Sequence, residues 1–212
     1  MLAPILDGVF GVWGLHLRPH PDAPGEIPAH LLSTVVNIAL AEDGSFGGDA
    51  RCDGLQLPFA SESFKLVIAQ HVLEQARSAE LLAEELARVL APEGIALLFG
   101  FNPASLWRAW AARRLAGSWQ VRAASSWRDV LARSRLDVLQ VRYSGLWSPW
   151  AAKAGGDSQA GPWLRPLGRF GGSWLLLARK RRSSLTPLRL NAVRSDLKVN
   201  PTLAHGARRE CA

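Results

Sequence analysis

The sequence predicts an α/β fold, a layered and mostly parallel sheet with helices on both faces and an antiparallel strand near the C-terminus. A strand pattern, an amphipathic helix pattern and a second strand pattern follow one another within residues 63–101. Both strand patterns are almost continuously apolar, as expected where both faces of a sheet are covered. Two further strand patterns, at 137–143 and 173–179, come late in the chain. Alternation of this kind is typical of α/β layers.

The N-terminal part carries two strand patterns separated by a loop. Residues 12–17 alternate well enough for a short strand, and 31–40 contain a β-branched run that predicts a second strand. The intervening segment 18–25 must be a loop, because prolines as dense as these break both helices and ladders. Residues 41–48, with three glycines, are predicted to be a turn region.

The middle of the chain predicts strand, helix and strand with clear boundaries. Residues 63–71 form the first strand, and Ser78 is the predicted N-cap of the helix. Apolar residues share one helical face at Leu82, Leu86, Val89 and Leu90. The outward face is predicted to carry Glu84, Glu85 and Arg88. Pro92 and Gly94 end the helix, and 95–101 form the next strand.

Two more helices are expected before the late strands. Asn102 followed by Pro103 predicts a capped helix start, with the helix reaching about Arg114. Ser125 or Ser126 is expected to open the other helix.

Length and charge predict one domain with a tail. The chain has 212 residues and 48% hydrophobic residues, enough for a substantial core. Residues 1–178 hold 16 Lys+Arg and 16 Asp+Glu, so the whole net charge of +7 lies in 179–212. We therefore expect a domain over 1–182 and a basic, flexible tail over 183–212.

Cysteine usage and hydropathy bear on location. Cys52 and Cys211 lie far apart, which argues against a disulfide framework. No apolar run reaches the roughly 18 residues that a membrane span needs, and the N-terminus lacks the basic region of a secretory signal. A cytoplasmic protein is the default expectation.

Ligands of open parallel sheets bind at the carboxyl ends of the strands. Four segments are predicted to converge there: the loop after Leu17, the Glu42–Asp43 turn, Asp53, and Gln70 with His71. A carboxylate of Glu42 or Asp43 suits a ribose diol, because it accepts both hydroxyl hydrogens. Asp53 would accept from an exocyclic amine.

Two more features belong to the predicted site. Leu57, Pro58 and Phe59 would wall an aromatic ring, and His71 would serve as a general base. Structural roles stay open for the polar residues. Asp53 would also serve as a turn-forming residue, Glu42 and Asp43 as a solvated turn, and His71 at a helix start or in packing.

A set of motifs spans about a quarter of the chain. They are Asp53 with Leu57-Pro58-Phe59, then Ser63-Phe64-Lys65, Val72-Leu73-Glu74-Gln75, and Glu85-Leu86-Ala87-Arg88-Val89-Leu90-Ala91-Pro92-Glu93-Gly94. This stretch resembles the class I S-adenosylmethionine-dependent methyltransferases of the type 11 group. Further motifs, Gly100–Trp107, Phe170–Arg181 and Thr186–Leu188, are similar to a poorly characterised bacterial branch of that family.

The resemblance implies a Rossmann-like sheet and S-adenosylmethionine as the cofactor, with Asp53 on the adenine side. The family has a Gly-x-Gly-x-Gly turn after its first strand, which lets the backbone approach the methionyl group. This chain has Arg18-Pro19-His20-Pro21 there instead. The family's Phe-Asp is Phe64-Lys65 here, and its Gly-Gly is Glu93-Gly94.

Two functions from different classes follow. The first is methyl transfer to an unknown acceptor. The second is a catalytically inactive binding module that uses an Arg/Trp face and the basic tail, with nucleic acid as a partner. Residues 108–142 hold eight arginines and two acids, and eight tryptophans lie between Trp107 and Trp174. Such tryptophans are more often core and lid than a ligand surface, and a basic tail without aromatic residues is more often a solvated extension. A third reading is a divergent or incomplete form of a longer enzyme.

Overall fold

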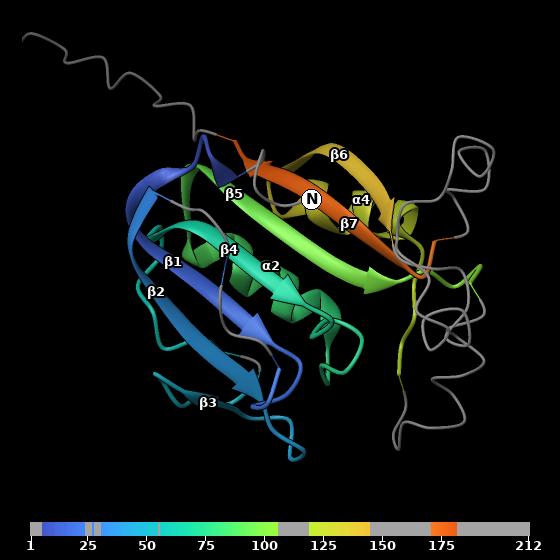
Figure 1. The fold of residues 1–212 in the computed structure, drawn as a ribbon, viewed down its shortest axis with the longest axis horizontal. Helices are drawn as coiled ribbons and strands as arrows, with labels where there is room; N and C mark the ends of the chain where they lie inside the picture. Colours follow the sequence, from blue (N-terminus) through green and yellow to red (C-terminus); the bar gives the residue numbers. More distant parts are fainter. Residues whose placement is uncertain are drawn as a thin grey trace, which may run out of the picture.

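The computed structural model describes residues 6–23, 27, 31–54, 56–105, 119–144 and 171–181. Within them, one seven-stranded sheet has the order β3-β2-β1-β4-β5-β7-β6 (Figure 1). The strands are β1 (Phe10–Arg18), β2 (Leu31–Leu40), β3 (Phe46–Gly48), β4 (Phe64–Gln70), β5 (Leu90–Phe101), β6 (Leu136–Ser144) and β7 (Ser173–Lys180). The helices are α2 (Ala79–Val89) and α4 (Ala124–Arg133).

The centre of the sheet is parallel and its margins are antiparallel. Strands β2, β1, β4 and β5 are parallel to one another. Strand β3 is antiparallel to β2, and β7, which lies between β5 and β6, is antiparallel to both. Leu17 lies beside Ile38 on one side and Ala69 on the other, so the carboxyl ends of β1, β2 and β4 meet at one edge. This arrangement confirms the predicted α/β class with a mostly parallel sheet, including the antiparallel strand near the C-terminus.

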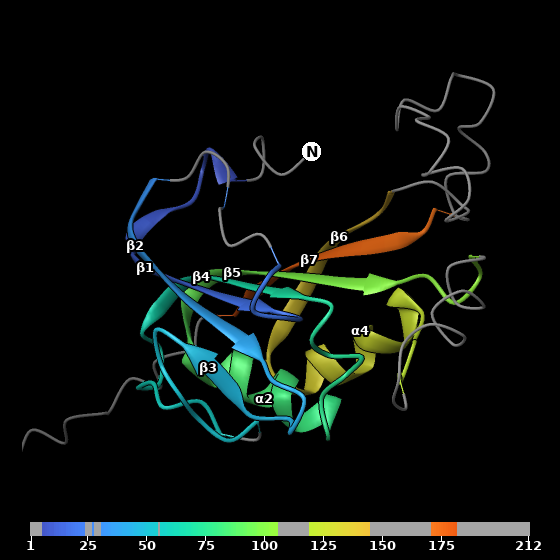
Figure 2. The same cartoon turned by 60° about the horizontal axis from the view of Figure 1, so that its bottom comes forward.

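Helices α2 and α4 lie on the same face of the sheet (Figure 2). Their buried side chains pack on alternate strand residues, with Leu82, Leu86 and Trp127 among the largest. Among the described residues, a second apolar cluster covers the opposite face: Leu6, Val9, Leu32, Leu66, Ile68, Leu97 and Leu175. The helix predicted after Asn102 falls mostly on 106–118, outside the described residues. No helix in the described part of the chain is long and apolar enough to span a bilayer.

Ser78 caps α2 as predicted, since its side chain accepts from Leu81 N. Arg88 and Glu80 lie in the last and first turns, where their charges favour the helix dipole. The predicted start of α4 is wrong by one or two residues. It begins at Ala124, and its N-cap Ala123 makes no side-chain bond.

Two strand boundaries also differ from the prediction. The turn region predicted over 41–48 contains β3, which is too short to show a periodicity and pairs with β2 after a tight turn. The strand predicted to begin at residue 95 begins at Leu90. Pro92 is tolerated there because the ladder between β4 and β5 shifts register near its start. The predicted tail, 183–212, lies outside the described residues.

Candidate functional site

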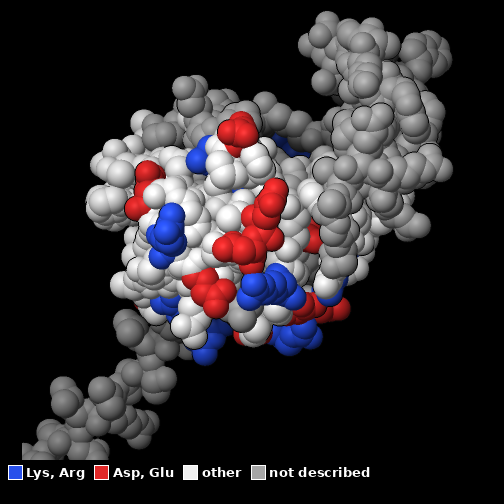
Figure 3. All heavy atoms as spheres, turned by 90° about the horizontal axis from the view of Figure 1, so that it is seen from below, with Lys and Arg blue, Asp and Glu red and all other residues white. Residues whose placement is uncertain are grey.

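Three loops meet at the carboxyl edge of β1, β2 and β4. A Cβ atom on Gly54 would lie 2.2 Å from the carbonyl oxygen of Gly44, so the Asp53-Gly54 segment packs directly on the turn that follows β2. Arg77, in the loop after β4, donates from Nη2 to the Asp43 carbonyl over 2.5 Å. Viewed from the end toward which β1 and β2 run, acidic side chains gather near the middle of the surface with basic ones beside them (Figure 3).

The three acids predicted at this edge differ in their hydrogen bonding. The Asp43 carboxylate accepts from the hydroxyl of Ser45 at 2.6 Å and from its backbone N–H at 2.9 Å, and these bonds hold the pKa of Asp43 below its ordinary value. Glu42 and Asp53 are exposed, and neither carboxylate makes a hydrogen bond or ion pair with any described residue. The carboxylate oxygens of Glu42 and Asp53 are therefore unpaired within the described part of the chain, whereas Asp43 shapes the turn.

The loop after β1 is closed by its own arginine. Arg18 donates from Nη1 to the carbonyl of Pro21 at 2.8 Å and to that of Ala23 at 2.7 Å. Its Nε is buried and has no hydrogen-bond partner among the described residues. Pro19 and Pro21 have no backbone N–H. Arg18 is therefore one of the few groups at this position that carry an N–H, and its Nε–H is unpartnered within the described part of the chain.

His71 follows β4 directly and lies beside an acid. Its Nδ1 is 3.2 Å from Oε2 of Glu74, whose side chain is only 3% exposed. The other carboxylate oxygen of Glu74 accepts from the backbone N–H of Phe101 at the end of β5. The His71 ring lies on that of Phe101, with 4.2 Å between centroids, and Phe101 in turn contacts Trp119 at 5.8 Å. Gln70, half-buried, ends β4 one residue earlier.

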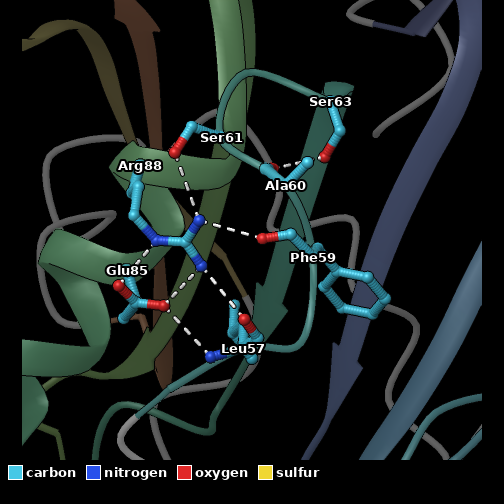
Figure 4. Close-up of polar contacts among 7 residues, drawn as sticks. All are labelled: Leu57, Phe59, Ala60, Ser61, Ser63, Glu85 and Arg88. Atoms are coloured by element: carbon cyan, nitrogen blue, oxygen red, sulfur yellow. Dashed lines mark hydrogen bonds and ion pairs between the residues drawn. The ribbon is translucent and has the colours of Figure 1, made fainter.

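The Leu57-Pro58-Phe59 segment is held by α2 (Figure 4). Arg88 donates from Nη2 to the carbonyl of Leu57 at 3.0 Å and from Nη1 to that of Phe59 at 2.9 Å. Glu85 pairs with both Nε and Nη2 of Arg88 at 2.8 Å and accepts from the backbone N–H of Leu57 at 3.0 Å. The prediction that Glu85 and Arg88 face solvent is wrong, because this loop covers them.

The same contacts place that segment away from the edge where the acids lie. Phe59 packs edge to face on Phe64, the first residue of β4, at 4.9 Å. Gln70 is the last residue of β4, and a strand advances about 3.3 Å per residue. The Leu57 side chain is buried in the core, and Pro58 is exposed. The structure thus brings together Glu42, Asp43 and Asp53, sets Gln70 and His71 at the same edge, and leaves Leu57-Pro58-Phe59 apart from them.

Sequence reasoning assigned no role to several residues near the edge. Glu74 belongs to the Val72–Gln75 motif, but nothing in the sequence alone marks it as buried. His16, 4% exposed, lies with Nδ1 3.2 Å from Oδ1 of Asn37 on the adjacent strand, which the alternation of polar and apolar residues does not reveal. No group of three or more His, Cys, Asp or Glu in the described ranges is arranged to hold a metal ion.

Comparisons with known proteins agree with the fold. Residues 34–98 match the family model for a methyltransferase domain. A search of curated protein sequences finds no match.

Solved structures with the same fold share little sequence with this chain. One belongs to a complex of the Haloferax volcanii Trm112 methyltransferase activator with a putative methyltransferase (TM-score 0.58, 14% identity, 82% of this chain and 84% of that chain). Another is an S-adenosylmethionine-dependent methyltransferase from Mesorhizobium loti (TM-score 0.55, 17% identity, 84% of this chain and 95% of that chain). A third is the [4+2]-cyclase SpnF (TM-score 0.56, 14% identity, 86% of this chain and 80% of that chain). The family-model match bears out the resemblance within residues 34–98, and the solved structures show that the fold is that of the methyltransferases.

Proposed function

We propose that this chain, which has a methyltransferase fold, is an S-adenosylmethionine-dependent methyltransferase whose cofactor lies at the carboxyl edge of β2, β1 and β4. The observation that carries the proposal is the contact between Gly54 and Gly44, which brings Asp53 against the Glu42–Asp43 turn. Open α/β sheets bind their ligands at this edge.

The residues present fit the adenosine part of the cofactor. Glu42 and Asp53 offer exposed carboxylates without partners among the described residues, and hydroxyl and amine hydrogens are what such carboxylates bind. On the methionyl side the prolines cannot supply the N–H groups of a glycine loop. Arg18, whose buried Nε–H has no partner among the described residues, is a donor in that place. A guanidinium pairs well with a carboxylate.

The cofactor would supply a methyl group on a sulfonium, ready for direct displacement. Such a reaction depends mainly on alignment of the two reactants. The chain would therefore contribute mostly binding: Glu42 and Asp53 to adenosine, Arg18 to the carboxylate. His71, at the end of β4, would take a proton from the acceptor.

Titration calorimetry with S-adenosylmethionine and S-adenosylhomocysteine tests the proposal. We expect saturable binding that Asp53→Ala weakens about 10-fold or more, since a hydrogen bond to a charged group contributes about 1.5–3 kcal/mol. Asp129→Ala is the matched control, because Asp129 is exposed on α4 and makes no hydrogen bond or ion pair with any described residue. No binding at millimolar ligand, with the circular dichroism of a folded protein, contradicts the proposal.

A second candidate, a binding module without catalysis, is favoured by the loop after β1, where Arg18 and prolines stand in place of the glycines. Arg128, Arg133 and Arg135, all exposed, give the α4 side a basic character. Fluorescence anisotropy with a labelled single-stranded DNA distinguishes the two functions. A salt-dependent affinity that is lost on truncation after Arg182 supports the module, and the absence of any salt-dependent shift rejects it.

A further inference from the structure

His71 is held in a backbone conformation that side chains rarely adopt. Its φ is +51°, in the left-handed region, where a residue other than glycine is strained. Its N–H donates to the carbonyl of Phe99 at 3.2 Å, and its own carbonyl accepts from Nε2 of Gln75 at 3.1 Å. Strain maintained by surrounding contacts is frequent where a side chain is placed for chemistry.

The buried acid Glu74 lies against Nδ1 of that imidazole. The residue is 2% exposed, and burial of a carboxylate is costly unless it is well bonded. One oxygen accepts from Phe101 N and the other faces Nδ1 of His71. With Glu74 as a carboxylate, which can only accept, Nδ1 carries the proton and the neutral ring has a bare Nε2. Nε2 makes no hydrogen bond with any described residue.

A purely structural role would not need the second oxygen. Glu74 joins the segment after β4 to β5 through Phe101 N, and its backbone carbonyl accepts from Gln120 N at 2.9 Å. A neutral glutamine would satisfy both of these bonds. What the carboxylate adds is a negative charge at Nδ1, which stabilises the ring when Nε2 takes up a proton.

We propose that Glu74 is a positioning residue that holds His71 as the Nδ1–H tautomer, with Nε2 as the base for a hydroxyl acceptor; this inference rests on the proposed function. The acceptor oxygen bonds to the methyl carbon while its hydrogen passes to Nε2. The carbon–sulfur bond breaks, and its electron pair stays on sulfur. A hydroxyl needs such a base because it becomes a cationic oxygen if it keeps the proton. An amine can be methylated first and lose a proton to water afterwards.

The tautomer can be measured without knowing the acceptor. Imidazole nitrogen shifts in the full chain, labelled with 15N-histidine and recorded near pH 8, report which nitrogen carries the proton, and His71→Asn assigns the signal. We expect the Nδ1–H form in the wild type and a shift toward the Nε2–H form in Glu74→Gln, whose amide N–H would donate to Nδ1. Glu84→Gln, on the exposed side of α2, is the matched control and leaves the signal unchanged. An Nε2–H form in the wild type, or no change in Glu74→Gln, overturns the role of Glu74.

The acceptor class is tested with matched pairs, phenol with aniline and 2-phenylethanol with 2-phenylethylamine, by mass spectrometry of methylated products. We expect methylated products from the hydroxyl compounds. Glu74→Gln should lower kcat about 100-fold, the lower end for loss of general-base catalysis, with KM for the cofactor within about twofold. Methylation of amines alone, or of neither class by protein that binds S-adenosylhomocysteine in calorimetry, overturns this inference. Loss of that binding overturns the proposed function and this inference with it.

Discussion

The β4–α2–β5 half of the sheet and the β1–β2 half each contain an arginine that donates to two backbone carbonyls. Arg88 reaches residues 29 and 31 positions away along the chain and is neutralised by Glu85. Arg18 reaches residues only 3 and 5 positions away, and it has no carboxylate partner among the described residues. The first arginine joins distant segments of the fold, whereas the second closes only its own loop.

This difference shows how a fold can persist while its ligand loop changes. Contacts of long sequence separation constrain both segments that they join, so the motifs of the β4–α2–β5 half must be kept together. The loop after β1 makes mainly local contacts, and its sequence can change at little cost to the sheet. We infer that the family motifs are concentrated in 53–101 for this reason.

Replacing each arginine by alanine is the strongest test of the comparison. Arg88→Ala removes the partner of the half-buried Glu85 and leaves the carbonyls of Leu57 and Phe59 unbonded, so we expect a loss of about 3 kcal/mol in the free energy of unfolding. Arg18→Ala removes two local bonds and also a buried donor without a partner, so its cost should stay below about 1 kcal/mol.

Urea unfolding followed by circular dichroism measures both losses. Arg128→Ala, on the exposed side of α4, is the control and should be within about 0.5 kcal/mol of the wild type. Equal losses for Arg88→Ala and Arg18→Ala would contradict the contrast between the two halves.

Two glycines, one in each half of the sheet, test how tightly the two halves are packed. A Cβ on Gly100 of β5 would lie 2.1 Å from the buried ring of Trp174, which also donates from Nε1 to the Arg122 carbonyl and cannot shift easily. We expect Gly100→Ala to cost about 2 kcal/mol by overpacking. In β1, a Cβ on Gly14 would meet the flexible end of Leu32 at 2.7 Å, so Gly14→Ala should cost less than about 1 kcal/mol.

Thermal unfolding of the two variants decides the point, and the melting temperature of Gly100→Ala should fall further. A larger fall for Gly14→Ala would show that the β1–β2 half is the more tightly packed one.

Substitutions of Glu93 test the β4–α2–β5 half with a smaller change in the free energy of unfolding, and here the change to glycine is the favourable one. Its φ is +59°, at the position where the family motif has the first glycine of Gly-Gly. Its ion pair with Arg179, at 3.8 Å and well exposed, contributes little. Glu93→Gly should therefore be about 1 kcal/mol more stable than Glu93→Ala, because only glycine adopts this conformation without strain. Equal stabilities in urea would mean that the backbone relaxes there.

Much of the fold was predictable from the sequence, because hydrophobic periodicity reports directly which face of an element is buried. The strands from β4 onward and α2 follow from it. The structure of residues 41–54 could not be predicted from periodicity, because β3 has only three residues. It is defined by its pairing with β2 and by the bridge between Phe46 and Cys52. Pairing over such short lengths leaves no periodic pattern.

The candidate site was predictable only in part. Strand order places Asp53, Glu42 and His71 at one edge, and the sequence shows that these residues follow strands. Glu85 was assigned to solvent because a helical pattern cannot reveal that a loop from 28 residues upstream covers it. The spacing of Glu85 and Arg88 within one helical turn was the available signal. Glu74 was missed because its burial depends on β5, which arrives later in the chain.

The ion pair between Arg88 and Glu85, here called the Arg88 clamp, gives the comparison with the smallest expected effect, through its pH dependence. The pKa of Glu85 lies below its ordinary value because Arg88 donates to it, with Leu57 N–H adding a further bond. A lowered pKa stabilises the folded protein at every pH above the ordinary value, roughly 4.3 for glutamate, and this contribution is lost as the pH falls through the folded pKa. The stability difference between the wild type and Glu85→Gln should stay constant from pH 7 to about 5 and shrink below about 4.3.

Urea titrations at each pH measure this difference. Asp43, Glu80 and Asp137 also have lowered pKa values, but they titrate in both proteins and cancel. Arg18→Ala is the control, because Arg18 has no carboxylate partner in the described part of the chain and its stability difference should not change over this range. A difference for Glu85→Gln that persists to pH 3 would show that the clamp is held by hydrogen-bond geometry rather than by charge, and the two arginines would then differ only in the length of chain that they bridge.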